Sequence, residues 1–330
     1  MHVLVCGGAG YIGSHMCKLL ASRGHQVTVF DNLSTGHKSA VRWGKFVQGD
    51  LLVQDDIEHV LGMASYSAAM HFSAKSLVGE SVRHPDIYYR NNVVGTVNLL
   101  DALVRHDIRN FIFSSSAAVY GNPEYSPIDE MHPARPINPY GKTKLIAENL
   151  LADYDSAYGL RSIALRYFNA AGADPEAQIG EAHDPETHLI PNILLSALNK
   201  VAHPLKVFGN DYATPDGTCV RDYIHVNDLC DAHIRALDYL VSGGATDIFN
   251  LGNGRGFSVA EVINAAKAVT GMDIPFDIVD RRPGDPPVLV ASAEKAKKML
   301  EWVPRYGELA DIIATAWRWH SRQQKQVVAP

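Results

Sequence analysis

The stretch that decides the fold is VLVCGGAGYIGSH, at residues 3–15. An apolar run predicts a buried strand over residues 2–6, and a helical pattern follows from residue 11. Between them the glycines fall at Gly7, Gly10 and Gly13. In this spacing the first glycine permits a tight turn, the second lets backbone approach a pyrophosphate, and the third allows a helix to pack closely on a strand. The pattern therefore predicts a dinucleotide-phosphate loop at the first strand–helix junction.

The alternation of strand and helix continues through the first half of the chain. We predict further strands at residues 27–31, 46–48, 68–72, 111–115 and 162–167, and helices at residues 11–22, 54–63, 86–105 and 139–158. Apolar strands that alternate with helices are typical of a parallel sheet covered on both faces. The predicted fold is therefore α/β, a doubly wound parallel sheet of the Rossmann type.

The composition of the sequence changes after Asn169, where the predicted loops are longer and rich in Pro, Asp and Gly. We expect a dinucleotide-binding domain at residues 1–169 and a smaller, mainly substrate-binding region at residues 170–330, with some segments returning to the first domain. In this region we predict helices at residues 189–200, 226–241, 259–269 and 308–321, and strands at residues 205–208 and 248–251.

Composition narrows the functional classes. The 330 residues are 46% hydrophobic and 20% charged, as in ordinary soluble proteins, and the formal charge of −6 gives no support for nucleic-acid binding. No apolar run approaches the roughly 20 residues that cross a bilayer, and the first strand leaves no room for a signal peptide. The four cysteines are scattered, so we expect reduced thiols and a cytoplasmic location. No metal site is expected, because His183 and His188 are interpreted as solvated loop residues.

Two carboxylates indicate which dinucleotide the loop would hold. Asp31 ends the second predicted strand. A carboxylate at that position can accept hydrogen bonds from ribose hydroxyls and would repel a 2′-phosphate, so the sequence favours NAD over NADP. Asp50 follows the third predicted strand, where it could contact the adenine amino group or, alternatively, cap the next helix.

A serine, a tyrosine and a lysine form the candidate catalytic set. Ser116 follows the strand at residues 111–115, whose carboxyl end faces the ligand crevice of such folds. Tyr140 opens the helix at residues 139–158 and Lys144 lies one turn further on, so their side chains share one helix face. A cation beside a phenol favours ionisation, which suits Tyr140 to general acid–base chemistry. Taken alone, the spacing could equally be an accidental surface pair.

This set, with the glycine loop, resembles the extended short-chain dehydrogenase/reductase superfamily. Longer matches cover nearly the whole chain and narrow the resemblance to the UDP-galactose 4-epimerase family; they include NPYGKTKLIAE (138–148), LRYFNAAGA (165–173) and FGNDYATPDGTCVRDYIHVNDL (208–229). The resemblance implies reversible inversion at C4 of a UDP-hexose, with tightly held NAD returned unchanged. It also implies a homodimer that pairs through the helices at residues 86–105 and 139–158.

The resemblance also assigns roles to residues of this chain. Tyr140 would take the proton of the 4-hydroxyl, Ser116 would bond the sugar oxygen, and Lys144 would hold the nicotinamide ribose. Together with the glycines, Asp31 and Asp50, the implied cofactor contacts include Tyr140, Lys144, Tyr11, Ile12, Asn32, Leu51, Phe72, Ser73, Ser76, Asn91 and Phe168. The implied substrate contacts are Ser116, Tyr140, Asn169, His188, Leu189, Phe208, Arg221, Arg282, Asp285 and Leu289.

Three positions depart from patterns seen in the family. Ser76 stands where some members carry a lysine, and the adjacent Lys75 is the alternative contact. His188 stands where asparagine can occur in the nucleotide site. Leu289 stands where other members have a tyrosine or a small residue, and bulk there limits the room beside the sugar. We expect UDP-glucose and UDP-galactose as the principal substrates, with activity on the N-acetylated pair left open.

Other functions of the same fold remain as alternatives. A UDP-uronate or UDP-pentose 4-epimerase would use the same first oxidation. Dehydration is disfavoured because Ser116 is followed by Ala117, Ala118 and Val119, without the acid pair that related dehydratases place there. A non-catalytic NAD-binding regulator is also disfavoured, since such proteins tend to lose the tyrosine or the lysine and this chain keeps both.

Overall fold

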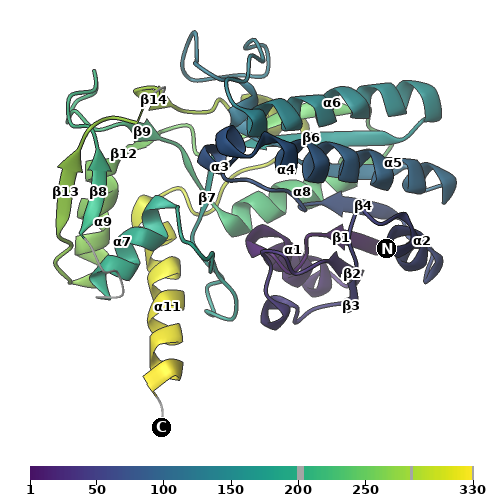
Figure 1. Cartoon of the computed structure of the whole chain (residues 1–330), viewed down its shortest axis with the longest axis horizontal. Helices are drawn as coiled ribbons and strands as arrows, with labels where there is room; N and C mark the ends of the chain where they lie inside the picture. Colours follow the sequence, from purple (N-terminus) through teal and green to yellow (C-terminus); the bar gives the residue numbers. More distant parts are fainter. Residues whose placement is uncertain (199–203, 283–284, 329–330) are drawn as a thin grey trace.

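The computed structural model describes residues 1–198, 204–282 and 285–328, with side chains up to residue 323. Its centre is a seven-stranded parallel sheet in the order β11-β6-β5-β4-β1-β2-β3 (Figure 1). These strands are β1 (His2–Cys6), β2 (Gln26–Asp31), β3 (Lys45–Gln48), β4 (Ala68–His71), β5 (Asn110–Ser114), β6 (Arg161–Tyr167) and β11 (Asp247–Leu251). The strand order reverses between β1 and β4, so a ligand crevice is expected outside their carboxyl ends. The predicted doubly wound α/β fold is confirmed.

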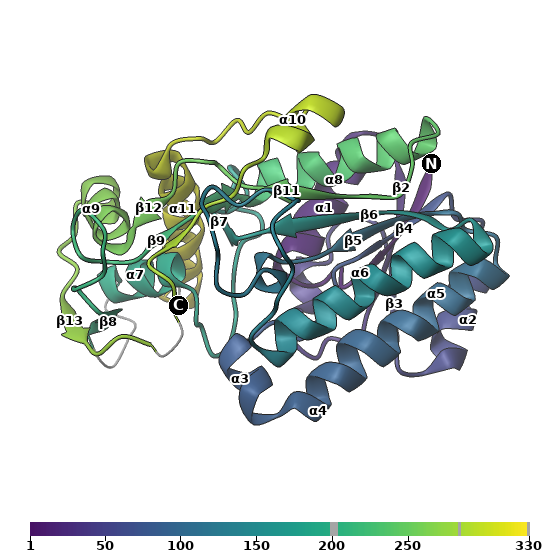
Figure 2. The same cartoon turned by 90° about the horizontal axis from the view of Figure 1, so that it is seen from above.

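Helices cover both faces of this sheet. Figure 2 shows α1 and α8 on one side of the sheet and α5 and α6 on the other. The first layer consists of α1 (Tyr11–Ser22) and α8 (Val226–Val241), with α10 (Glu294–Met299) beside β11. The second layer consists of α2 (Gln54–Gly62), α5 (Gly95–Arg105) and α6 (Pro139–Tyr158). Each layer buries its own apolar cluster against the sheet, which explains why the central strands are apolar on both faces.

The helix predicted at residues 86–105 is corrected to consecutive segments. After α3 (Val78–Arg83) come α4 (Pro85–Tyr88), a π-helical segment η2 (Tyr89–Val94) and then α5. The wider π turn carries Asn92, which is only 3% exposed and bonds both backbone groups of Lys75. A π segment in this position therefore joins the helix layer to the loop that follows β4.

Most of the C-terminal half packs beside the main sheet, around an apolar cluster of its own (Figure 1). Its helices are α7 (Leu189–Ala197), α9 (Val259–Thr270) and α11 (Leu309–Val328). Its strands form small sheets, namely β7 (Asn169–Ala171) with β10 (Tyr223–His225), β8 (Leu205–Phe208) with β13 (Phe276–Val279), and β9 (Val220–Arg221) with β12 (Phe257–Ser258) and β14 (Val288–Leu289). The 3-10 turns η1 (Lys38–Ala40) and η3 (Ala117–Val119) lie in the connections after β2 and β5.

Some predicted helix ends differ from the structure, most by a single residue. The helix at α7 ends at Ala197, and residues 199–200 of the prediction lie outside the described residues. The helix at α11 runs to Val328 rather than to residue 321, because the following residues RQQKQ have high helix propensity. The end of α2 at Gly62 differs by one residue, within the ordinary uncertainty of helix ends.

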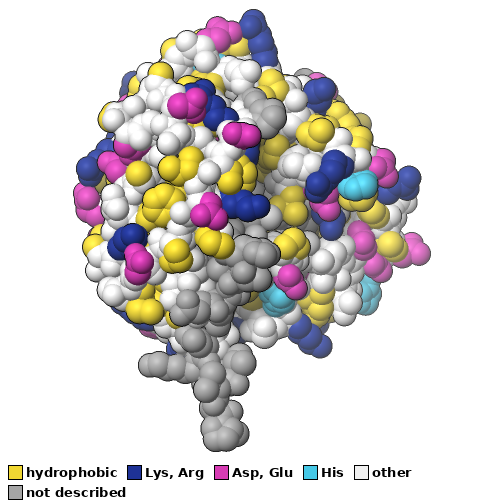
Figure 3. All heavy atoms as spheres, turned by 60° about the vertical axis from the view of Figure 1, so that its left-hand side comes forward, with side chains coloured by type: hydrophobic (Ala, Val, Ile, Leu, Met, Phe, Trp, Pro, Cys, Tyr) yellow, Lys and Arg dark blue, Asp and Glu magenta, His cyan; other side chains and the backbone are white. Residues whose placement is uncertain are grey.

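The described surface is mixed in character (Figure 3), and the cysteines are reduced. On the face drawn in Figure 3, side chains of both charge signs are interspersed with apolar ones. The four cysteines, Cys6, Cys17, Cys219 and Cys230, are all free and buried. Among the described residues, no helix combines the length and the apolar character needed to span a membrane.

Candidate active site

The protein's own packing requires glycine at two of the three regularly spaced positions of the first loop, Gly7 and Gly13, but not at Gly10. Gly7 has φ +81°, and a Cβ there would lie 2.6 Å from the backbone nitrogen of Ser73, in the loop after β4. A Cβ at Gly13 would lie 2.1 Å from the carbonyl oxygen of Gly7. At Gly10, by contrast, the nearest atom would be at 3.4 Å, an ordinary contact. Gly10 is therefore not required by the protein's own packing, and its missing side chain leaves room for a ligand.

The start of α1 fits an anionic group. Gly10 is its N-cap, and no described side chain caps the first turn. The N–H groups of Tyr11, Ile12 and Gly13 therefore begin the helix without a side-chain acceptor, and the helix dipole favours negative charge beside them. A pyrophosphate fits this cradle, as expected for NAD.

The acidic residues near this loop support its backbone. Asp31 is 8% exposed, and its carboxylate accepts hydrogen bonds from the N–H groups of Ala9 at 3.0 Å and Leu33 at 2.8 Å. A carboxylate has about four lone-pair sites, so acceptor capacity remains for ribose hydroxyls. The amide of Asn32 donates to Asp50 at 3.0 Å, which brings these two predicted cofactor contacts together.

Asp50 and Leu51 begin the turn between β3 and α2. Asp50 also accepts from the backbone of Leu52 at 2.8 Å, so its carboxylate shapes this turn. Leu51 is 8% exposed and belongs to the apolar cluster under α5. Its predicted contact with a cofactor can therefore come mainly from its backbone.

The loop after β4 contains three further predicted cofactor contacts, and a fourth, Asn91, lies beside it in η2. Phe72 packs against His233 of α8, with ring centroids 4.9 Å apart, and Ser73 lies against Gly7. Ser76 is exposed, whereas Lys75 is partly buried and its backbone is held by Asn92. Asn91 donates to the same Asn92 side chain at 2.9 Å. The lysine side chain and Ser76 thus lie on one short, well-anchored loop.

The first turn of α6 explains the sequence NPYG at residues 138–141. Asn138 caps the helix by accepting from the N–H of Gly141 at 2.8 Å, and Pro139 occupies the first turn. A Cβ at Gly141 would lie 2.3 Å from the carbonyl oxygen of Ala118. Only glycine lets α6 approach η3 this closely, and this approach brings Tyr140 toward Ser116.

The side chains of Tyr140 and Ser116 lie close together. Burial raises the pKa of the Tyr140 hydroxyl above its ordinary value, and the nearby Ser116 hydroxyl offsets part of this rise. Ser116 is also the N-cap of η3, where its hydroxyl accepts from the N–H of Ala118 at 3.1 Å. The serine hydroxyl is thereby oriented to donate to the tyrosine or to a bound oxygen.

Lys144 lies below this pair and contacts the strand rather than the phenol. It is 3% exposed, and its ammonium donates to the carbonyl oxygen of Ser114 at 2.7 Å. Its Nζ lies 5.9 Å from the centre of the Tyr140 ring. Burial lowers the pKa of Lys144 to about 7, and Glu148 offsets part of this shift. Lys144 is thus close enough to influence Tyr140 through charge, without a direct hydrogen bond to it.

A buried ion pair fixes the middle of α6, and the sequence analysis did not identify it. Glu148 accepts from Arg166 of β6 at 2.9 and 2.5 Å and from the hydroxyl of Ser115 at 2.5 Å. Burial alone would lower the pKa of Arg166, but its bonds to Glu148 raise it. Glu148 lies one helical turn beyond Lys144, a spacing that could have indicated its place on the same buried face.

A second group of predicted residues lies around β9 and β14. Arg221 forms an ion pair with Asp285, and Leu289 pairs with Arg221 across the strands. The guanidinium of Arg282 lies 3.9 Å from the centre of the Phe208 ring. Two arginines beside an aromatic ring can bind a diphosphate and a flat base.

Phe168 and Leu289 connect the two groups. Both pack against a small apolar cluster formed by Val119 at the end of η3, Tyr120 and Ile128. Asn169 follows Phe168, and its amide donates to the carbonyl oxygen of Asp222 at 2.9 Å. The side chains predicted to hold the sugar therefore come from segments that meet beside the Ser116–Tyr140 pair.

Leu189 and His188 stand apart from both groups. Leu189 begins α7 and His188 is its N-cap residue, without a capping side-chain bond. The imidazole of His188 hydrogen-bonds Glu181, and His183 lies against the same carboxylate. The structure thus brings both histidines to one buried acid, which the sequence did not predict.

Comparison with known proteins identifies the family to which the chain belongs. Residues 3–252 match the model of the NAD dependent epimerase/dehydratase family. The chain belongs to this family. A UDP-glucose 4-epimerase of Rhizobium leguminosarum bv. trifolii is 51% identical over 323 residues, covering 98% of each chain. The resemblance seen in the sequence is therefore confirmed.

Solved structures of the NAD dependent epimerase/dehydratase family superpose closely on this chain. The UDP-glucose 4-epimerase from Brucella ovis in complex with NAD has a TM-score of 0.94 and 52% identity, covering 96% of this chain and 97% of that one. The UDP-glucose 4-epimerase from Bifidobacterium longum in complex with NAD+ and UDP has a TM-score of 0.92 and 36% identity, covering 98% and 99%.

Proposed function

We propose that this chain is an NAD-dependent isomerase that interconverts UDP-galactose and UDP-glucose by inversion at C4. The observation that carries the proposal is the closeness of the Ser116 and Tyr140 side chains, just beyond the carboxyl end of β5. It occurs in a chain about half identical, over nearly its full length, to UDP-glucose 4-epimerases. The first loop fits NAD because Gly10 leaves open space beside an uncapped helix start.

The chain's own residues would move one proton. When bound, oxidised NAD supplies a hydride acceptor for C4 and a positive charge that favours an ionised tyrosine. Tyr140 would accept the 4-hydroxyl proton and later return it, as a general base and then a general acid. Ser116, held by its bond to the Ala118 N–H, would keep the sugar oxygen within reach of the phenol. Lys144 would hold the nicotinamide ribose and add positive charge beneath Tyr140.

The remaining cofactor contacts would hold the adenosine half and close the site. Asp31, with acceptor capacity left beyond its two backbone bonds, would bind ribose hydroxyls. Further contacts are proposed at Gly7, Gly10, Tyr11, Ile12, Gly13, Asn32, Asp50, Leu51, Phe72, Ser73, Ser76, Asn91 and Phe168. Lys75 stays the alternative to Ser76, because only the lysine is long enough to reach a phosphate from that loop.

The UDP-sugar would bind between β9, β14 and the Tyr140 helix. Arg221 and Arg282 would bind the diphosphate, and Phe208 would offer its ring to the base. Asp285, already paired with Arg221, orients that guanidinium. Further contacts are proposed at Asn169, His188, Leu189 and Leu289. Leu289 packs on the cluster at the end of η3, where a larger side chain would narrow the sugar pocket.

A homodimer and a cytoplasmic location complete the proposal. Apolar side chains are exposed along the segment before α5; they include Val82, Ile87 and Val94, which are 62%, 40% and 49% exposed. Pairing of this segment and α6 across two subunits would cover them. Four free, buried cysteines support a reducing compartment.

Incubation of the purified protein with UDP-galactose, without added NAD, tests the proposal. We expect UDP-glucose to accumulate until both sugars reach equilibrium, because the cofactor is returned unchanged in each turnover. Parallel reactions with UDP-N-acetylgalactosamine and a UDP-pentose define the substrate range. Absence of UDP-glucose from a folded, NAD-containing preparation would refute the proposed function.

A further inference from the structure

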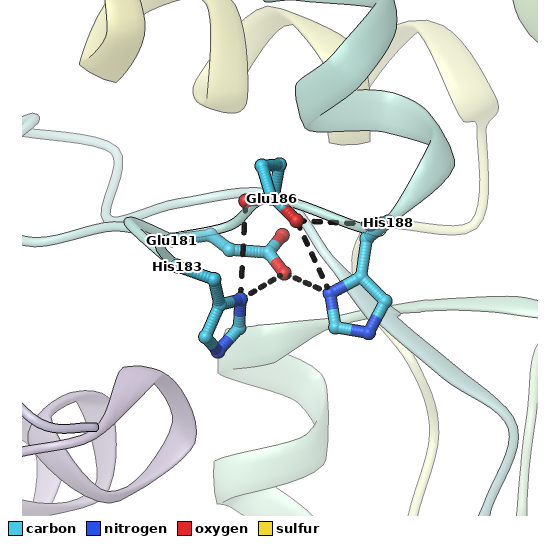
Figure 4. Close-up of side chains that lie close together, drawn as sticks. All are labelled: Glu181, His183, Glu186 and His188. Carbon is cyan, nitrogen blue, oxygen red and sulfur yellow. Dashed lines mark hydrogen bonds and ion pairs between the residues drawn. The ribbon is translucent and has the colours of Figure 1, made fainter. Parts of the chain in front are cut away.

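Four potential metal ligands converge between β7 and α7, outside the catalytic set. They are Glu181, His183, Glu186 and His188, and one ligand atom from each lies within 4.8 Å of the others. Figure 4 shows the Nδ1 atoms of both imidazoles pointing toward the Glu181 carboxylate, with Glu186 beside them. All four come from an eight-residue stretch, so a single loop would supply the whole site.

The separations lie on either side of the spacing of ligands around a small ion, within a few tenths of an ångström for three of the pairs. His183 Nδ1 lies 3.1 Å from Glu181 Oε1 and 3.8 Å from Glu186 Oε2, and His188 Nδ1 lies 3.7 Å from Glu186 Oε1. Ligands held tetrahedrally at zinc distances lie roughly 3.3–3.6 Å apart. The His188–Glu181 contact is a direct hydrogen bond, so these two atoms must separate when an ion enters.

The cluster needs positive charge at its centre. The side chains of Glu181 and Glu186 are only 3% and 8% exposed, and buried carboxylates require a partner. His183 Nδ1 is buried, yet it makes no hydrogen bond of acceptable geometry with any described residue. This nitrogen therefore lacks a satisfactory partner, and an ion with two positive charges would bind it and balance the two carboxylates.

We propose that Glu181, His183, Glu186 and His188 bind one divalent transition-metal ion, with zinc as the best match. Two imidazoles favour zinc and its neighbours over magnesium and calcium, which prefer oxygen ligands throughout. Four protein ligands fill a tetrahedral shell, so the ion is structural and leaves no position for a reacting molecule. The ion would use Nδ1 of His188, so the contact with the substrate proposed for this residue would fall to its other ring nitrogen.

The surrounding contacts give this ion a structural task. The carbonyl oxygen of Glu181 accepts from Trp319 of α11 at 3.0 Å, and the ring of His183 packs edge-on against Tyr11. Tyr11, the first residue of α1, donates to the carbonyl oxygen of Gly172 at 2.6 Å. The ion would therefore pin the loop that joins the start of α1 to α7 and α11.

Metal binding to the purified, NAD-containing protein tests the proposal directly. After dialysis against a chelator, zinc is titrated by calorimetry, and cobalt(II) is added separately to read the coordination from its visible spectrum. We expect one zinc per chain, an intense tetrahedral cobalt band and a higher unfolding temperature with zinc. His183→Ala should weaken zinc binding at least about 100-fold. Loss of a residue that only hydrogen-bonds a metal ligand can weaken binding by about 100-fold, and loss of a ligand itself should cost at least as much.

Two further variants make the result decisive. Glu186→Gln keeps the shape of the side chain and removes its charge, and it should lose the cobalt band even if His183→Ala misfolds. His59→Ala, at an exposed histidine on α2, should bind zinc as the wild type does. Binding well below one zinc per chain, or equal binding by the wild type and Glu186→Gln, would overturn the proposal.

Discussion

Replacing Gly141 by alanine tests the close approach that brings Tyr140 to Ser116. A Cβ at Gly141 would lie 2.3 Å from the carbonyl oxygen of Ala118, whereas ordinary contact begins at 3.4 Å. The first turn of α6 must therefore retreat from η3 by about 1 Å, the difference between these two distances. Tyr140 precedes Gly141 on that turn, so its hydroxyl would move away from Ser116.

The expected loss follows from this displacement. A misplacement of about 1 Å lowers a rate by about 100-fold, or about 2.7 kcal/mol in activation free energy. We expect kcat for conversion of UDP-galactose to fall by about that factor. Bound NAD, measured after denaturation, should stay near wild type, because the glycine loop of α1 is untouched.

A matched variant separates this effect from general damage to a helix. Gly62 closes α2, and a Cβ there would meet nothing within 4 Å. Gly62→Ala should therefore leave kcat unchanged. Thermal unfolding of both variants checks that each is folded. A folded Gly141→Ala protein with kcat within twofold of wild type would refute the reasoning.

The remaining predictions concern three side chains of the site. Tyr140→Phe should lower kcat at least about 100-fold while NAD stays bound, and unchanged turnover would remove its acid–base role. Leu289→Tyr should lower any activity on N-acetylated UDP-hexoses relative to UDP-galactose by about tenfold or more, and an unchanged ratio would exclude Leu289 as a size gate. The folded-state pKa of Lys144, about 7, lies below its ordinary value of 10.5. The unfolded chain therefore binds more protons between these values, and NAD-free protein should gain about 2 kcal/mol of unfolding free energy from pH 7 to 9. Lys144→Met should lack this gain, and equal slopes of wild type and variant in denaturant titrations would contradict it.

The fold could be predicted because its signals are local. The β1–α1 junction has its glycines at fixed spacing, and the strands of the main sheet are short apolar runs. Such patterns need no knowledge of distant partners. The π segment was missed because its cause is distant: Asn92 bonds the backbone of Lys75, in a loop that no helical periodicity reveals.

Parts of the site depend on contacts between segments far apart in sequence. The spacing of Tyr140 and Lys144 was visible in the sequence. The requirement for glycine at Gly141, however, comes from the backbone of Ala118, which packs directly against it. The pair between Glu148 and Arg166 likewise joins α6 to β6. Sequence showed each charge separately, whereas only the fold shows that the two are buried together.

The cluster at residues 181–188 illustrates the opposite case. Its residues are close in sequence, yet their pattern matches no common metal motif, and acidic loops are usually solvated. What distinguishes them is burial of Glu181 and the convergence of two imidazoles on it, and both arise from packing against α1 and α11. Burial of this kind has no local signature in the sequence.

Conversion of UDP-galactose that carries deuterium at C4 tests the central claim most directly. If the chain inverts that carbon by removing and returning the same hydride, the deuterium should stay at C4. We predict UDP-glucose with the label retained at C4, read by NMR and mass spectrometry. Release of the label to solvent, its appearance at another carbon, or failure to form UDP-glucose would contradict this mechanism.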